Sequence, residues 1–255
     1  MKGDGVLDGA MSLRMIGITG FSAYSTGFVQ MLCAICFLLF IFYKNNRNLK
    51  LNKNESIVLV LIILSAIISA RSSFLGILIF LLIFFKLSNF KQSFKFIMLA
   101  ITLLIGLIIT VVSFVPAEFK DFFINWLTEL FVSGTDTGSL QANVNMFIYD
   151  FHDFSLIGDS RWFGDNNDYY MNTDVGWYRV LFSVGYLGLC VWILIILSII
   201  NWKEILSLKI SVESWIILLL VAYVFIMTFK GAILFDSFQS LFILLSIKIA
   251  LFHKN

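Results

Sequence analysis

Several basic residues of this 255-residue chain lie at the edges of long apolar stretches, where a charge is costly unless it has a partner. They are Arg14, Arg71, Arg161, Arg179 and Lys230. Arg71 is the most unusual, because it separates the apolar runs 57–70 and 74–85 and has no acidic residue near it in sequence. The planar guanidinium fork binds phosphate oxygens in pairs. Several converging arginines therefore predict a site for a diphosphate group.

Each of these charges also has a simpler explanation. Arg14, Arg161 and Arg179 are expected near a membrane interface, where their side chains can reach lipid headgroups. Lys230 has Asp236 nearby in sequence, and a Lys–Asp pair is more often structural than catalytic. Both explanations are compatible with the sequence.

A carboxylate and several aromatic residues accompany the arginines in segment 156–188, which is rich in Asp, Asn, Tyr and Trp. This composition suits sugars, because amides and carboxylates bind hydroxyl groups and aromatic faces cover the C–H faces of pyranose rings. Asp174 and Tyr178 both belong to this segment. Anchoring of Trp and Tyr at a membrane surface is the alternative.

Other chemistries find little support in the sequence. There is no Walker motif, no HExxH and no GxSxG, and the three cysteines lie inside apolar blocks. We therefore expect no metal and no cofactor. His152 is a minor catalytic candidate, and His253 lies at the carboxy-terminal tail. Nucleic acid is not an expected partner, because the basic residues lie in loops that orient the chain in a membrane.

The composition predicts an all-α, polytopic membrane protein. Sixty per cent of the residues are hydrophobic, 13% are charged, and only one is proline. The apolar residues form long blocks rather than the period-two alternation of membrane barrel strands. Seven spans are predicted, at about 22–43, 57–70, 73–85, 96–115, 177–200, 215–229 and 232–252.

The charges of the connecting segments predict the orientation. Segment 44–55 carries four basic residues against one acidic residue, and segment 86–95 carries three lysines and no acid, so both face the cytoplasm. Segment 57–85 must then be a hairpin with its turn at 70–73 on the outer side. As one helix it would be roughly 43 Å long, whereas the hydrocarbon core is about 30 Å thick.

Three regions follow from this orientation. Residues 1–115 hold four spans, residues 116–176 form a large outer loop, and residues 177–255 hold three more spans. The loop has ten acidic residues against two basic ones. An odd number of spans starting on the outside suggests that further spans precede the chain. We therefore expect it to be the carboxy-terminal portion of a longer protein.

Four short segments combine these residues in a characteristic order. They are RMIGITGFSAYSTG with Arg14, SARSSFLG with Arg71, LIGDSR followed by NTDVGWYRVLFSVGYLG, and TFKGAIL with Lys230. They resemble, in turn, an R-x-x-G segment before a span, an S-R-S/G-x-x-L turn, an S/T-D-V-G-Y-x-R segment and a penultimate turn with a lysine. Together they resemble the O-antigen and capsule polymerases of bacteria, which are related to O-antigen ligases.

This resemblance implies a glycosyltransferase of the bacterial inner (plasma) membrane, with several spans and a periplasmic active face. It would transfer a glycan from undecaprenyl diphosphate to a sugar hydroxyl of the next lipid-linked repeat unit, building lipopolysaccharide or capsule. Arg14, Arg71 and Asp174 would be catalytic, and Arg161, Tyr178, Arg179 and Lys230 would bind substrate. Membrane lipids and a chain-length regulator protein are the other implied partners.

The chain also departs from the family pattern, and two other functions remain. Full members have about a dozen spans, so a protein of seven is inactive if the missing spans help to form the site. An O-antigen ligase is the first alternative, but ligases have a histidine in the region of Asp174, and His152 is poorly placed for this role. A non-catalytic transporter or flippase is the second, and it predicts polar groups at mid-depth in the helices.

Overall fold

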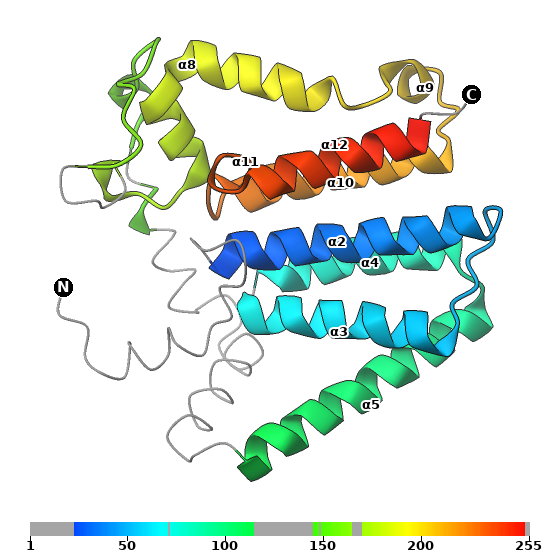
Figure 1. Cartoon of the computed structure of the whole chain (residues 1–255). Coiled ribbons are helices and arrows are strands. Elements are labelled where there is room, and N and C mark those ends of the chain that lie inside the picture. Colours follow the sequence, from blue (N-terminus) through cyan, green and yellow to red (C-terminus); the bar gives the residue numbers. More distant parts are fainter. Residues whose placement is uncertain (1–22, 71, 115–144, 148, 165–169, 253–255) are drawn as a thin grey trace. The chain divides into compact units, whose positions relative to one another are not determined.

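The computed structural model describes residues 23–70, 72–114, 145–147, 149–164 and 170–252 (Figure 1). The chain divides into two compact units, Met1–Thr135 and Asp136–Asn255. Within the described ranges the regular structure consists of nine α-helices and two short 3-10 helices. The predicted all-α class is confirmed.

The first unit contains four helices that match the first four apolar blocks. They are α2 (Ala23–Lys44), α3 (Lys53–Ser69), α4 (Ser73–Leu87) and α5 (Phe90–Phe114). α3 begins before its apolar block because Asn52 caps it: the Asn52 side chain accepts from the Glu55 amide at 2.8 Å, and the Glu55 carboxylate accepts from the Asn52 amide at 2.9 Å. This reciprocal capping box supplies two partners at a helix end that would otherwise lack them.

The predicted hairpin at 70–73 is present. α3 ends at Ser69, the backbone of the next residue, Ala70, is extended (φ −157°, ψ 136°), and the Ser73 amide donates to the Ala70 carbonyl at 3.0 Å. Figure 1 shows α3 and α4 running in opposite directions, and α2 packs against both. Arg71 itself lies outside the described residues, but its neighbours contact α2 closely. A side chain at Gly27 would collide with the Ser73 hydroxyl and approach Ala70 Cβ to 3.2 Å.

Hydrogen bonds of polar side chains join α2 and α4 to α3 next to this turn. Gln30 donates to the Ser65 hydroxyl at 2.8 Å and accepts from Ser69 at 3.1 Å, while Ser73 donates to the Ala66 carbonyl at 2.7 Å. Inside an apolar bundle such groups must find internal partners, and each bond fixes the relative position of two segments. The turn that carries residue 71 is therefore held on the first turns of α2.

The second unit contains the remaining described elements. They are η2 (Phe151–Asp153), η3 (Tyr170–Asn172), α8 (Gly176–Leu197), α9 (Trp202–Leu206), α10 (Val212–Thr228), α11 (Ile233–Asp236) and α12 (Phe238–Phe252). The predicted apolar block 232–252 is not one continuous helix, because the chain is extended at Ser237 (φ −138°, ψ 100°) between α11 and α12. The carboxylate of Asp236, the last residue of α11, is bound by α8 at this break.

α8 is also not a straight span. Gly185 has φ 65° and ψ −171°, a conformation open essentially to glycine alone, and Figure 1 shows the resulting bend. The backbone groups freed by the bend pair with the end of the large loop. Four hydrogen bonds run from Asp159 N to Phe182 O (2.7 Å), Ser160 N to Ser183 O (3.0 Å), Tyr186 N to Ser155 O (3.3 Å) and Leu187 N to Leu156 O (3.1 Å). The loop therefore satisfies the backbone groups that the helix loses.

Substitution of Gly185 by alanine should release this loop. The new Cβ would lie 2.5 Å from Gly158 N and from Leu156 O, and the backbone conformation would add strain of about 1–3 kcal/mol. We expect a clearly lower thermal unfolding temperature in detergent and faster proteolysis within residues 154–164. Gly106→Ala is the matched control, since nothing lies within 4 Å of the added Cβ. Equal stability of the two variants would contradict the docking.

Three described helices are long and apolar enough to span a membrane. They are Tyr24–Lys44, Phe90–Thr110 and Gly176–Leu197. Three apolar helices are shorter: Ser73–Leu87, Val212–Thr228 and Gln239–Phe252. The predicted number of seven spans is not established by these lengths, and the straight part of α8 after Gly185 is only roughly 18 Å long.

Candidate functional site

A buried ion pair forms the centre of the second unit. Arg179 Nη1 donates to Asp236 Oδ2 at 2.9 Å, and the two side chains are only 1% and 9% exposed. Arg179 lies in the first turn of α8 and Asp236 ends α11, so the pair joins segments that are 57 residues apart. A bond between ionised partners is strong, and breaking it would leave an uncompensated buried charge.

The large loop covers this pair with an aromatic ring. The Arg179 guanidinium carbon lies 4.3 Å from the centroid of the Trp162 ring, a distance suited to a cation–π interaction. Trp162 packs in turn against Phe235, with 5.6 Å between the ring centroids. The guanidinium is therefore held by a carboxylate from α11 and by an aromatic face from the loop.

The start of α8 is pressed against the turn between α10 and α11. A Cβ on Gly176 would lie 2.5 Å from both Ala232 N and Gly231 O, so only glycine permits this approach. The approach brings the Asp174–Arg179 segment next to the turn that carries Lys230. The sequence predicts a role for each of these two segments separately, and the structure brings them together.

The pKa of Asp174 depends on three nearby charged side chains as well as on burial. Loss of water on burial raises the pKa of its carboxyl, the positive charges of Lys230 and Arg179 oppose that rise, and Asp236 adds to it. The side chain is half-buried. A carboxylate with a raised pKa is a stronger proton acceptor than an ordinary aspartate, and groups perturbed in this way gather at functional sites.

The structure describes three more of the predicted residues. Arg161 is exposed and lies 5.9 Å from the centroid of the Tyr170 ring. The Tyr178 hydroxyl donates to the Tyr149 carbonyl at 3.1 Å, which ties the loop to α8. His152 is exposed in η2. Arg14 and Arg71 lie outside the described residues.

The structure changes two expectations about charged residues, one for Arg179 and one for Asp236. The suggestion that Arg179 reaches lipid headgroups is wrong, because its side chain is buried in an ion pair. The ion pair described for Asp236 is with Arg179, whereas its position in sequence suggested Lys230 as the partner. A signal was available, since Asp236 is the sole acidic residue of 232–252 and such a charge needs a basic partner.

Trp162 was not predicted as an individual site residue. It is one of many aromatic residues in segment 156–188, and nothing local distinguishes it from the others. Its contact with Arg179 depends on loop docking across the bend at Gly185, which is a long-range feature.

Aromatic residues also fix the loop on the first half of α8. Phe154 packs against Phe182, with 4.8 Å between centroids, and Tyr149 meets the same ring at 5.0 Å. The buried core of this cluster is Phe154, Leu181 and Phe182. The loop residues of the site are therefore held against α8 by a packed hydrophobic cluster.

Comparison of the chain with protein-family models, with curated proteins and with solved structures found no match. Its function is therefore inferred from the residues and their arrangement, together with the resemblance of the four short segments.

Proposed function

We propose that the chain is part of a membrane glycosyltransferase that polymerises lipid-linked oligosaccharide repeat units on the outer face of the bacterial inner membrane. One observation carries the proposal: the close approach of Gly176 to Gly231 and Ala232 brings the segment with Asp174 next to the turn with Lys230, in the unit that holds the buried Arg179–Asp236 pair. NTDVGWYR and TFKGAIL each resemble a polymerase segment by their residues alone, and a shared site is what that resemblance predicts.

The chemistry assigned to these residues is a single displacement at the anomeric carbon. The bond from this carbon to the diphosphate oxygen breaks, and its electron pair leaves with undecaprenyl diphosphate. The acceptor hydroxyl oxygen forms the new glycosidic bond from the opposite face, so the configuration inverts. Asp174 takes the hydroxyl proton, which its raised pKa favours.

Positive charge is needed where the leaving group develops its charge. Lys230, at the turn next to Asp174, is the candidate within this unit. The family resemblance also assigns catalytic roles to Arg14 and Arg71, which lie outside the described residues. Arg179 is already bound to Asp236. We propose that Arg179 positions Asp174 and Trp162 and adds to the local positive potential.

Complementation of a strain lacking its surface-polysaccharide polymerase tests the proposal. The complete reading frame that contains this chain should restore a ladder of long glycans on a gel, and Arg71→Ala in that frame should reduce it to single-repeat material. Lys248→Gln is the control, since its amine donates to the Ser198 carbonyl on the far part of the unit. A wild-type ladder from Arg71→Ala would remove the role of that arginine, and no ladder from the unmodified frame would contradict the proposal.

A transporter of lipid-linked sugars is a second candidate, and one observation favours it. Both α8 and the last apolar block are interrupted, at Gly185 and Ser237, and transporters commonly bind substrate between such broken helices. The two candidates differ in product, because a transporter moves single repeat units and leaves their number of sugars unchanged.

The pH dependence of transfer gives a separate test. If Asp174 accepts the proton, kcat/KM should fall on acidification with a midpoint above the ordinary aspartate pKa of about 3.9. Lys230 lowers the pKa of Asp174, so Lys230→Gln should move this midpoint to still higher pH. Lys203→Gln in α9 should leave the midpoint in place. The same midpoint in wild type and Lys230→Gln would contradict the coupling.

A further inference from the structure

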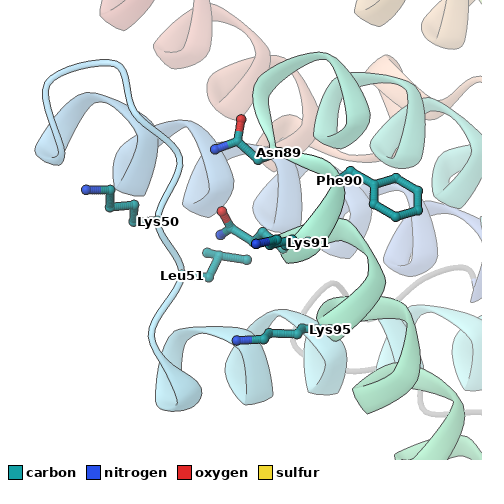
Figure 2. A pocket seen from close by; sticks show the side chains of 7 residues that line it. Lys50, Leu51, Asn89, Phe90, Lys91 and Lys95 are labelled. Atoms are coloured by element: carbon teal, nitrogen blue, oxygen red, sulfur yellow. The ribbon is translucent and has the colours of Figure 1, made fainter.

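The two basic loops of the first unit meet in a pocket. Segment 44–55 and the start of α5 line an open pocket of about 540 Å³, and Figure 2 shows its side chains. The lining residues are Lys50, Leu51, Asn89, Phe90, Lys91, Gln92 and Lys95. Three of the seven are lysines, and no carboxylate is among these described lining residues. Orientation of the chain in the membrane requires lysines in both loops, but it does not require that they line one pocket.

Specific contacts hold the two sides of the pocket together. Leu49 is buried, and the Asn45 side chain donates to the Lys50 carbonyl at 3.0 Å, which fixes the loop after α2. The Gln92 side chain lies against the Leu49 carbonyl and the Leu51 amide, and exchange of its amide oxygen and nitrogen would let it donate to the first and accept from the second. The lysines therefore project from a built scaffold.

The arrangement of the charges favours a bound anion. Lys91 and Lys95 are four residues apart, so they lie on the same face of α5 and repel each other. Both also lie near the amino end of a 25-residue helix, where the helix dipole disfavours cations. The nearby carboxylate of Glu55 is already bonded to the Asn52 amide and lies 3.5 Å from the Lys44 amine. A phosphate would relieve the repulsion between Lys91 and Lys95.

Exposed apolar side chains beside the lysines indicate what carries the phosphate. Phe90 is 85% exposed and Phe94 is 59% exposed, and both alternate with the lysines on the first turns of α5. The exposed apolar surface continues along the helix through Met98, Ile101, Ile105 and Ile109. A soluble phosphate compound would gain nothing from this surface, whereas acyl chains would cover it.

We propose that this pocket binds the phosphate of an anionic phospholipid headgroup, with the acyl chains lying along the exposed apolar face of α5. Basic pockets at the ends of membrane helices hold such headgroups through the same combination of lysine charge and apolar contact. The proposal does not depend on the proposed glycosyltransferase activity, because it concerns a different unit and different residues.

Lipid binding to the complete purified protein in neutral nanodiscs tests the proposal. Native mass spectrometry and a fluorescent-lipid titration would compare phosphatidylglycerol, phosphatidylcholine and soluble glycerol phosphate. We expect phosphatidylglycerol to bind at least tenfold more tightly than the other two. Lys50→Gln/Lys91→Gln/Lys95→Gln should abolish the preference, and Lys91→Gln alone should weaken it severalfold.

A charge-matched control separates a defined site from general attraction. Lys53→Gln/Lys203→Gln/Lys209→Gln removes three lysines from the same predicted face without touching the pocket lining, and it should keep the preference. Cysteine labelling of the loops would verify that each variant keeps its orientation. Equal loss in both triple variants would overturn the site, and glycerol phosphate binding as tight as phosphatidylglycerol would overturn the lipid assignment.

Discussion

Asp236→Leu is expected to lower the free energy of unfolding of the Asp136–Asn255 unit by about 3–5 kcal/mol, the usual result of removing one partner from a buried ion pair. The Arg179 guanidinium would stay buried with its Nη1 partner gone, and an arginine cannot be neutralised by losing a proton. Equilibrium unfolding in mixed detergent micelles would measure the loss. Lys44→Gln is the control, because the Lys44–Glu55 pair is 3.5 Å long with a lysine side chain that is 56% exposed. Exposed pairs contribute only about 0–1 kcal/mol.

The double variant Arg179→Leu/Asp236→Leu should recover most of the lost stability. Apolar residues of similar volume can replace a buried pair at little cost, although the contact with Trp162 would lose its cation. A double variant as unstable as Asp236→Leu would show that the pair is not the cause. The recovered variant then isolates function: it should be folded yet form little glycan, because it lacks the arginine that we assign to the positioning of Trp162 and Asp174.

Asp174→Asn is expected to reduce glycan transfer by about 10²–10⁴-fold, the usual contribution of a positioned base. Stability should not fall. Burial raises the pKa of Asp174 in the folded protein, so its ionised form is disfavoured by folding, and a neutral amide removes that cost at neutral pH. The ratio of long glycan to single-repeat glycan, normalised to protein amount, is the measurement.

Asp159→Asn is the matched control for this substitution. Asp159 belongs to the same loop, is exposed, and accepts from the Tyr170 hydroxyl at 3.1 Å, a bond that an amide oxygen can keep. We expect it to retain wild-type polymer. Retained polymer in Asp174→Asn as well would reduce Asp174 to a structural residue of the loop.

The helices were predictable from the sequence where the signal is local. Long apolar blocks predicted α2, α4, α5 and α10, and the basic residues on both sides of 57–85 required the break between α3 and α4. The bend at Gly185 was not predictable, because a single glycine is tolerated in an apolar helix and the bend depends on a loop about 25 residues earlier in sequence. The break at Ser237 has the same origin, since Asp236 bonds to a distant helix.

Part of the site was also predictable, where the signal in the sequence is local. Arg179 and Lys230 were selected because charges next to apolar runs are expensive, and Asp174 was selected from the family resemblance; the structure brings their segments together. Their individual roles depend on which charged side chains pair with one another. That is decided by the close approach of Gly176 to Gly231 and by the docking of Trp162, both contacts between segments far apart in sequence.

Transfer by the purified complete protein in liposomes is the most direct test of the proposed function. The substrate would be a synthetic undecaprenyl-diphosphate-linked repeat unit, and mass spectrometry would follow the products. We predict glycans of two, three and more repeats, with one undecaprenyl diphosphate released for each new bond. Single-repeat lipid that crosses the bilayer without growing in length would contradict the polymerase and support a transporter.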